Sequence, residues 1–241
     1  MVKVSSEYDR RIVEVAKVFD EIAEGFRHSR TRIWPSTKNF YEKYIRGRRG
    51  ILLDLGCGTG RNTIYFASRG LRVISVDISL KMLKIAREEV KHKLPRGQVE
   101  LVQAEVTKLP FKENTFDFIV AIAVIHHIPY KEMRIKMLKE ARRVLKKNGI
   151  IYVTAWSLAN IRRVLKALKE KILNPFKVEF GDTYIAWHTK GKTYQRYYHL
   201  YTLRELKEDL RKAGFRILEA YKEFKRKLFF YENAVVIGIK E

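Results

Sequence analysis

The chain of 241 residues has one cysteine, Cys57, and no apolar run that approaches the length of a membrane span. A single cysteine cannot form an internal disulfide, and it also excludes a zinc site built from several cysteines. The charged N-terminus lacks the apolar stretch of a secretory signal peptide. We therefore expect a cytoplasmic protein with no metal site.

Acidic residues are scarce beside basic ones. The sequence has 27 Asp and Glu against 50 Lys and Arg, which gives a formal net charge of +23. An excess of one sign on this scale opposes the compact state unless an anionic partner binds. Nucleic acid is the natural partner, and an anionic membrane surface is the second candidate. Hydrophobic residues make up 46% of the chain, which is enough for one sizeable core.

The most informative motif is a glycine-rich stretch, residues 51–62, which reads ILLDLGCGTGRN. Its first residues are apolar, as in a buried parallel strand, and a helix is predicted from residue 61. Gly56, Gly58 and Gly60 lie between them, where glycine allows a sharp turn and lets a ligand reach the main chain. The N–H groups that open the following helix favour a negative group. Taken alone, the pattern also fits a plain strand–turn–helix connection.

A second predicted strand, residues 71–76, ends at Asp77. In an open α/β sheet, ligands bind outside the carboxyl ends of the strands, and an acid about 20 residues beyond the glycines suits a pair of ribose hydroxyls. The alternative for Asp77 is the N-cap of a helix over residues 80–90, a position for which Ser79 competes. The G-x-G-x-G spacing differs from the G-x-G-x-x-G of dinucleotide-binding dehydrogenases. We favour the ribose interpretation.

These motifs resemble the class I S-adenosylmethionine-dependent methyltransferases over residues 50–156. DLGCGTG is similar to the nucleotide loop of that family, and VDIS with Asp77 is similar to its second motif. The resemblance implies an enzyme that uses S-adenosylmethionine. It also implies a set of cofactor-binding residues: Asp54, Gly56, Cys57, Gly58, Gly60, Asp77, Ile78, Glu105, Val106 and Ala121.

Two residues of this set need a separate interpretation. Cys57 is interpreted as a small buried filler beside the cofactor. Glu105 follows the third predicted strand, where the family often has an aspartate near the adenine, and it is one methylene longer than that residue. A solvated surface glutamate is the alternative for Glu105.

Strands and helices alternate along the middle of the chain, which predicts a doubly wound, mostly parallel sheet. The resemblance implies a seven-stranded α/β sheet of the Rossmann-like type. The predicted strands are residues 50–55, 71–76, 98–103, 116–124, 150–156, 215–220 and 234–239, and the predicted helices are 7–24, 37–45, 61–68, 80–90, 131–145, 158–173 and 203–212. Residues 174–196 are expected to be an irregular surface insertion.

The chain is most simply one domain with an added segment. Residues 1–49 form a basic, helical segment on the substrate side, and residues 50–241 form the main domain. An insertion over residues 157–201 interrupts that domain before its last helix.

Two further motifs bear on the substrate. His126 and His127 follow the fourth predicted strand, where a histidine could bind, orient or deprotonate a substrate, or could serve only the structure. Residues 195–201 read QRYYHLY, and no acid occurs between Thr183 and Arg204. The planar side chains of aromatic residues and arginine stack on unpaired bases, while Lys and Arg bind the phosphates of the backbone. A packed aromatic strand is the alternative for the tyrosines.

Together these motifs resemble the tRNA wobble-uridine carboxymethyl methyltransferases. The matching pieces are FRHSRTRIWP, IAVIHHI, IYVTAW, Trp187-His188, and RYYHLY with Glu205-Leu206. The long insert that eukaryotic members carry before RYYH is missing, which suggests a compact prokaryotic or archaeal relative. The resemblance implies methylation of the carboxylate of 5-carboxymethyluridine in tRNA, with a small zinc-binding activator protein as a further partner, and no DNA or membrane partner.

Such a reaction needs alignment more than proton transfer, because a carboxylate is ionised near neutral pH. A fixed cation is needed on the second carboxylate oxygen, and bidentate geometry favours an arginine. The catalytic candidates are Arg30, His127, Arg196 and His199, and the candidate RNA contacts are Trp34, Trp187, His188, Tyr197 and Tyr198. The alternatives are a methyltransferase for a small molecule such as a quinone precursor, one for another RNA base, and a non-catalytic RNA-binding subunit that keeps the cofactor fold.

Overall fold

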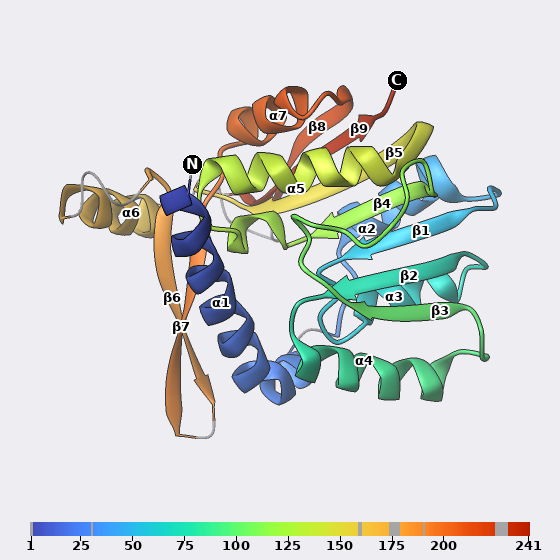
Figure 1. The fold of residues 1–241 in the computed structure, drawn as a ribbon, viewed down its shortest axis with the longest axis horizontal. Coiled ribbons are helices and arrows are strands. Elements are labelled where there is room, and N and C mark those ends of the chain that lie inside the picture. The colour runs from blue at the N-terminus through green and yellow to red at the C-terminus, as the bar shows by residue number, and fades with distance from the viewer. Residues whose placement is uncertain (1, 30, 159–160, 174–178, 190, 225–230) are drawn as a thin grey trace.

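Seven strands form one sheet at the centre of the molecule (Figure 1). They are β1 (Ile51–Leu55), β2 (Arg72–Asp77), β3 (Val99–Gln103), β4 (Phe116–Ile122), β5 (Leu145–Trp156), β8 (Arg216–Phe224) and β9 (Tyr231–Ile239). The computed structural model describes residues 2–29, 31–158, 161–173, 179–189, 191–224 and 231–241. The strand order is β3-β2-β1-β4-β5-β9-β8, and only β9 runs antiparallel to its neighbours β5 and β8. The predicted fold class is confirmed.

The strand order reverses at β1. From β1 the chain proceeds outward to β2 and β3, and it then returns to place β4 on the other side of β1. Loops that leave β1 and β4 therefore diverge, and a crevice opens at the carboxyl ends of these strands. The crevice lies where the glycine-rich turn and Asp77 are found, so the sheet topology brings the two sequence motifs together.

Helices cover both faces of the sheet (Figure 1). They include α2 (Pro35–Phe40), the π-helical segment η1 (Tyr41–Ile45), α3 (Arg61–Ala67), α5 (Lys131–Val144) and α7 (Leu203–Lys212). Successive strand residues point to opposite faces. Accordingly, Ile119 packs in a cluster with Leu138 of α5 and Leu206 of α7, whereas Val120 packs with Phe40 and Phe66 on the other face. The predicted helix over residues 37–45 is thus split between α2 and η1.

The long N-terminal helix α1 (Val2–Ser29) lies along the edge of the sheet at which β1, β2 and β4 end (Figure 1). It contains the predicted helix over residues 7–24. Its buried Ile22 packs against Met82 and Ile85 of α4 (Leu80–Lys93). None of the helices in the described part of the chain is long and apolar enough to cross a membrane.

The prediction of an irregular insertion over residues 174–196 is wrong for the residues that the structure describes. After α6 (Ile161–Leu173), β6 (Asp182–Thr189) and β7 (Lys192–His199) form an antiparallel two-stranded sheet. Residues 174–178 and 190 lie outside the described residues. The low apolar content of the segment was misleading. The exposed parts of the two strands have few tertiary contacts, and the buried part of the hairpin consists largely of aromatic residues.

A serine between β2 and α4 connects α1 to the sheet. The Ser79 hydroxyl donates to Asp20 of α1 at 2.6 Å, and its oxygen accepts the Met82 N–H at 3.1 Å as the N-cap of α4. Ser79→Ala removes both bonds. We expect it to lower the free energy of unfolding by about 1–2 kcal/mol, measured as a lower urea midpoint with an unchanged m-value.

Ser68→Ala is the matched control. The Ser68 side chain is exposed; it donates to the main chain of Tyr65 and accepts from the exposed Arg69, both at the same helix end. We expect a change within about 0.5 kcal/mol. Equal midpoints for Ser79→Ala and the control would show that the link between α1 and α4 does not stabilise the fold.

Candidate active site

A pocket with an open volume of about 1080 Å³ lies at the carboxyl ends of β1, β2 and β4. Its floor comes from the glycine-rich turn, and its walls come from α1, the segment after β4, the end of β5 and strand β7. Residues from these elements that line it include Gly56, Cys57, Gly58, Asp77, Ile78, Val106, Phe19, Phe26, Trp34, Arg61, His126, His127, Trp156, Arg196 and Tyr198. The size and mixed lining are those of a small-molecule site.

The glycines of the turn are required by its geometry. Gly56 has φ +62°, and a Cβ there would lie 2.4 Å from a methyl group of Val124. Gly58 has φ +55°, and a Cβ there would meet only the Phe26 ring, at 3.8 Å, within the pocket. A side chain at Gly58 would therefore take up ligand space, so the glycine lets a ligand approach the backbone.

Asp77 is fixed by two main-chain N–H groups at the pocket. Gly58 donates to one carboxylate oxygen at 2.8 Å, and Ser79 donates to the other at 2.9 Å. Burial raises the pKa of Asp77 to about 6, although these hydrogen bonds oppose the shift. The carboxylate is thus ionised at neutral pH and can accept hydroxyl donors. Ser79 caps α4, so the alternative that Asp77 is the N-cap is wrong.

Asp54 and Cys57 support the turn by different means. Asp54 is 1% exposed and accepts the Thr63 hydroxyl at 2.7 Å, and burial raises its pKa to about 7. Asp54 does not line the pocket; it binds Thr63 of α3, the helix that follows the turn. Burial also raises the pKa of the Cys57 thiol well above its usual value, so this cysteine serves as an unreactive filler in the lining.

The remaining predicted cofactor residues divide into two groups. Ile78 and Val106 line the pocket, whereas Gly60 and Ala121 lie behind it, and Ile122 and Ala123 form the lining in place of Ala121. The half-buried Glu105 lies outside the lining, where it accepts the Tyr8 hydroxyl of α1 at 2.6 Å and also the Thr107 hydroxyl. Its carboxylate therefore connects α1 to the end of β3, and it is not a solvated surface group.

His126 and His127 are fixed in opposite tautomers. The main-chain N–H of Trp156 donates to Nδ1 of His126 at 3.1 Å, so that nitrogen carries a lone pair. Nδ1 of His127 lies 3.0 Å from the main-chain oxygen of Tyr197, which can only accept, so this Nδ1 carries the proton. In a neutral ring, Nε2 of His127 is then an acceptor.

The ring of His127 is indeed neutral. Burial lowers its pKa to about 3; the hydrogen bond to Tyr197 opposes the shift, and the charge of Arg196 adds to it. The interpretation of His127 as a fixed cation is therefore wrong, and its chemistry in the pocket is that of a hydrogen-bond acceptor. Its ring also packs edge-on against Phe19 at 4.8 Å and against Tyr198 at 4.5 Å.

Arg196 brings a positive charge into the pocket. It is 5% exposed, and its guanidinium lies 4.8 Å from the ring centre of Trp187 and 5.2 Å from that of Tyr198. Tyr198 in turn stacks on His126 at 5.1 Å. Trp187 does not line the pocket itself; it holds the guanidinium from outside.

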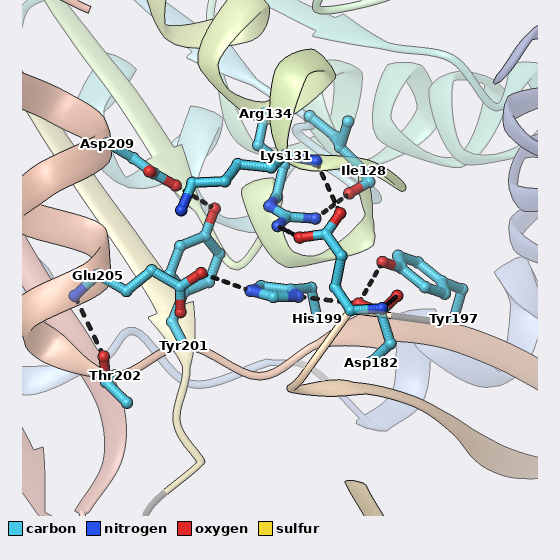
Figure 2. A network of polar contacts seen from close by, with 11 residues as sticks. Ile128, Lys131, Arg134, Asp182, Tyr197, His199, Tyr201, Thr202, Glu205 and Asp209 are labelled. Carbon is cyan, nitrogen blue, oxygen red and sulfur yellow. Dashed lines mark hydrogen bonds and ion pairs between the residues drawn. The ribbon is translucent and has the colours of Figure 1, made fainter. Parts of the chain in front are cut away.

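The other predicted site residues lie elsewhere. His199 and Tyr197 point away from the pocket into a polar network (Figure 2). His188 is exposed and bonds Thr193 at 2.8 Å. Arg30 lies outside the described residues.

Several lining residues were missed by sequence reasoning. Phe19 and Phe26 come from α1, whose amphipathic pattern gives its buried face but not what that face covers. Trp156 ends β5 beside His126. Arg61 follows the glycine motif directly, donates to the Arg32 carbonyl at 2.9 Å, and places its guanidinium 5.7 Å from the Trp34 ring. Its position at the start of α3, next to the ligand loop, was the signal that could have found it.

Comparison with known proteins identifies the family. Residues 53–153 match the family model for a methyltransferase domain. The crystal structure of an S-adenosylmethionine-dependent methyltransferase from Methanosarcina mazei superposes with a TM-score of 0.69 at 24% identity, covering 86% of this chain and 98% of that one. A protein of Encephalitozoon cuniculi named as a methyltransferase is 31% identical over 214 residues, which are 89% of this chain and 91% of that one. The chain belongs to the class I S-adenosylmethionine-dependent methyltransferases.

Two further proteins similar to this chain have names that mention tRNA or a partner protein. The tRNA (carboxymethyluridine(34)-5-O)-methyltransferase of Schizosaccharomyces pombe is 29% identical over 235 residues, covering 88% of this chain and 92% of that one. A methyltransferase in complex with the Trm112 methyltransferase activator of Haloferax volcanii has a TM-score of 0.66 at 16% identity, covering 93% of this chain and 96% of that one.

The pocket of this methyltransferase fits S-adenosylmethionine. The bare backbone at Gly58 allows close approach, Asp77 offers an ionised acceptor for ribose hydroxyls, and Ile78 and Val106 provide apolar walls for a base. Bound there, S-adenosylmethionine supplies a methyl group on a positively charged sulfur. The residues that line the rest of the pocket determine from which side an acceptor can reach that methyl group.

Asp77→Ala tests the ribose assignment. Removing the acceptor leaves buried ribose hydroxyls unpaired, so we expect S-adenosylmethionine affinity to fall by about 1–3 kcal/mol, or roughly 5–150-fold. Isothermal titration calorimetry on the folded variant measures the change. Glu100→Ala on β3 is the control, because its exposed carboxylate pairs only with Arg72 at the opposite end of β2. Equal affinity of the two variants would refute the assignment.

Proposed function

We propose that this methyltransferase transfers the methyl group to the carboxylate of 5-carboxymethyluridine at the wobble position of tRNA, forming the methyl ester. The observation that carries the proposal is Arg196, a buried guanidinium in the pocket wall next to His127. The name of the Schizosaccharomyces pombe relative and the net charge of +23 support the same substrate.

Arg196 has the properties that a carboxylate clamp needs. The stacking of its guanidinium near Trp187 and Tyr198 restricts the planar fork to a narrow range of orientations. A planar fork can hold one or both oxygens of a carboxylate, and a buried charge is screened little. Arg61 is a second cation in the lining, and Arg30 remains a candidate from the sequence.

The reaction places few demands on acid–base groups. One carboxylate oxygen forms the bond to the methyl carbon while the carbon–sulfur bond breaks, and the electron pair of that bond stays on sulfur. No proton moves. The protein must hold the oxygen, carbon and sulfur in line at near-attack distance, which lowers the entropic part of the barrier. A neutral His127 suits this chemistry because it neither competes for the carboxylate charge nor protonates it.

His127 and the aromatic residues around it would orient the base. With the proton on Nδ1, the Nε2 atom of His127 can accept the N3–H of a uracil ring. Trp34 and Tyr198 line the pocket and offer planes for stacking an unpaired base. The sequence predicted Trp34 and Tyr197 as the stacking residues. For Tyr197 this is wrong, because its hydroxyl donates to Asp182 on the other side of β7.

Two partners follow from this proposal. The tRNA backbone would be neutralised by the excess of basic side chains. A small zinc-binding activator protein of the kind seen with the Haloferax volcanii methyltransferase is the second partner that we propose. Co-purification and activity with and without such a protein would show whether this chain needs it.

Arg196→Lys is the sharpest test of the substrate. Lysine keeps the charge but lacks the planar fork, so we expect it to lower the rate of methyl transfer nearly as much as Arg196→Ala, by about tenfold to a thousandfold. Single-turnover transfer from labelled S-adenosylmethionine to tRNA bearing 5-carboxymethyluridine measures the rate, and nucleoside mass analysis identifies the product. Affinity for tRNA should change little, since phosphate contacts lie elsewhere.

Arg72→Lys provides the control, because Arg72 pairs with the exposed Glu100 at the far end of β2 and its variant should keep the normal rate. A normal rate in both Arg196 variants would mean that other groups hold the carboxylate. Methyl transfer to a small molecule or to another RNA base, with none to carboxymethyluridine, would replace the proposed substrate.

Binding of tRNA should depend steeply on salt. If about six phosphates are neutralised, affinity should fall about a thousandfold between 50 and 200 mM salt. Filter binding or fluorescence anisotropy at several salt concentrations gives the slope. A flat dependence would mean that the excess positive charge serves another partner.

A further inference from the structure

His199 lies between two carboxylates on opposite sides of its ring (Figure 2). Nδ1 is 2.8 Å from Asp182 of β6, which is its direct cross-strand neighbour, and Nε2 is 2.9 Å from Glu205 in the first turn of α7. The His199 side chain is 1% exposed. The ring therefore joins the end of the β6–β7 hairpin to the helix that follows it.

The geometry decides the charge of this ring. An ionised carboxylate only accepts hydrogen bonds, so both ring nitrogens must donate, and His199 is an imidazolium. Burial works against this charge, but the bonds to Asp182 and Glu205 outweigh it, and the pKa of His199 is raised. In agreement, the pKa values of Asp182 and Glu205 are lowered: burial raises them, but the hydrogen bonds and charge of His199, together with other donors and cations nearby, outweigh it.

Other polar groups surround this ring. The charged and titratable groups that face it are Asp182 of β6, Glu179 before it, Tyr197 of β7, Tyr201, Lys131 and Arg134 of α5, and Glu205 and Asp209 of α7. The fully buried Arg134 pairs with Glu179 at 2.6 Å, and the Glu179 N–H donates to Asp182 at 3.1 Å. The two cations, Arg134 and His199, thus pair with three carboxylates, those of Glu179, Asp182 and Glu205. These contacts join α5, the start of β6, β7 and α7.

The two faces of β7 have different tasks. Successive side chains of a strand point to opposite faces. Tyr197 and His199 face the polar network, where the Tyr197 hydroxyl donates to Asp182 at 2.7 Å, while Arg196 and Tyr198 line the pocket. The main-chain oxygen of Tyr197 also accepts a hydrogen bond from Nδ1 of His127. Movement of β7 would therefore displace Arg196 and Tyr198 and would release His127.

We propose that His199 is a positioning residue: held as an imidazolium between Asp182 and Glu205, it fixes strand β7 so that Arg196, Tyr198 and His127 keep their places in the pocket. It touches neither substrate nor cofactor. The role predicted for it from the sequence, a cation that contacts the substrate, is replaced by this one. The inference holds whichever methyl acceptor the enzyme uses.

The arrangement should depend on pH in a defined direction. A raised pKa means that the stabilisation is complete below the ordinary histidine pKa of about 6.5 and is lost as the pH rises through the higher value in the folded protein. Above that value one ring nitrogen presents a lone pair to a carboxylate. The other titrating groups on the pocket act at lower pH, since burial brings the pKa of Asp77 to about 6 and that of His127 to about 3.

Hydrogen exchange with mass spectrometry tests the proposal on the whole chain without any substrate. At pH 6, His199→Gln should lower the protection of the amides in β7 at least about tenfold. After correction for chemical exchange, protection of β7 in the unaltered protein should fall as the pH rises above 6.5, and this step should be missing in His199→Gln. The matched control is His188→Gln on the same hairpin. Among the described residues its exposed side chain bonds Thr193 alone, so the step should stay intact.

A second variant keeps the test decisive if His199→Gln fails to fold. Glu205→Gln removes one of the two carboxylates, so the step should move to lower pH. A flat pH dependence of β7 protection in the unaltered protein, or an unmoved step in Glu205→Gln, would overturn the proposal.

Activity supplies the readout that separates positioning from simple stability. Under conditions where the variant is folded, His199→Gln should slow methyl transfer at least about tenfold and remove the alkaline limb of the rate profile, with S-adenosylmethionine affinity unchanged. A normal rate with a retained alkaline limb would refute positioning. If tRNA bearing 5-carboxymethyluridine accepts no methyl group at all, the proposed substrate is wrong, and hydrogen exchange still decides the role of His199.

Discussion

The floor of the pocket depends on the attachment of the glycine-rich turn after β1 to the end of the neighbouring strand β2. The Gly58 N–H donates to Asp77 at 2.8 Å, and this bond joins the end of β1 to the end of β2 at the point where the strand order reverses. The turn can take this path only because position 56 has no side chain, since Val124 occupies the space where a Cβ would lie. Steric exclusion on one side and a buried acceptor on the other thus fix the floor of the site.

The walls of the pocket are held by a different kind of force. Strand β7 is only part of a two-stranded sheet, and two strands alone are marginally stable in water. Buried ion pairs on one face of β7 and aromatic packing around Arg196 on the other provide the stabilisation that two strands alone lack. Buried charges are costly to desolvate, and they specify geometry well only when every partner is present. The central sheet is held by apolar packing, whereas the substrate wall is held by charges.

The features that could be predicted from the sequence are those that a short-range pattern determines. Apolar runs gave the central strands, and the glycine turn with Asp77 gave the floor of the pocket. The sequence did not predict the hairpin, because residues 182–189 mix polar and apolar side chains without a clear alternation, and their partner strand lies beyond a turn. It also could not tell which of Arg196 and His199 enters the pocket. Alternation along a strand puts them on opposite faces, but which face borders the pocket depends on tertiary contacts. Phe19 was missed because the amphipathic pattern of α1 does not show what its buried face covers, whereas Arg61 was overlooked although it directly follows the glycine motif.

The contacts between α1 and the hairpin have a consequence for the order of folding. Phe26 packs against Trp187 at 5.8 Å, and Glu21 accepts the Tyr194 hydroxyl across 173 positions of sequence. During synthesis the helix leaves the ribosome long before its partner strand exists. Helix α4 can cover the part of the apolar face around Ile22 early, but the part around Phe26 stays uncovered until the hairpin has been made. Long-range contacts of this kind form slowly because a large loop must close first. The wall that α1 and the hairpin form together is therefore completed only after the first five strands of the sheet have been made.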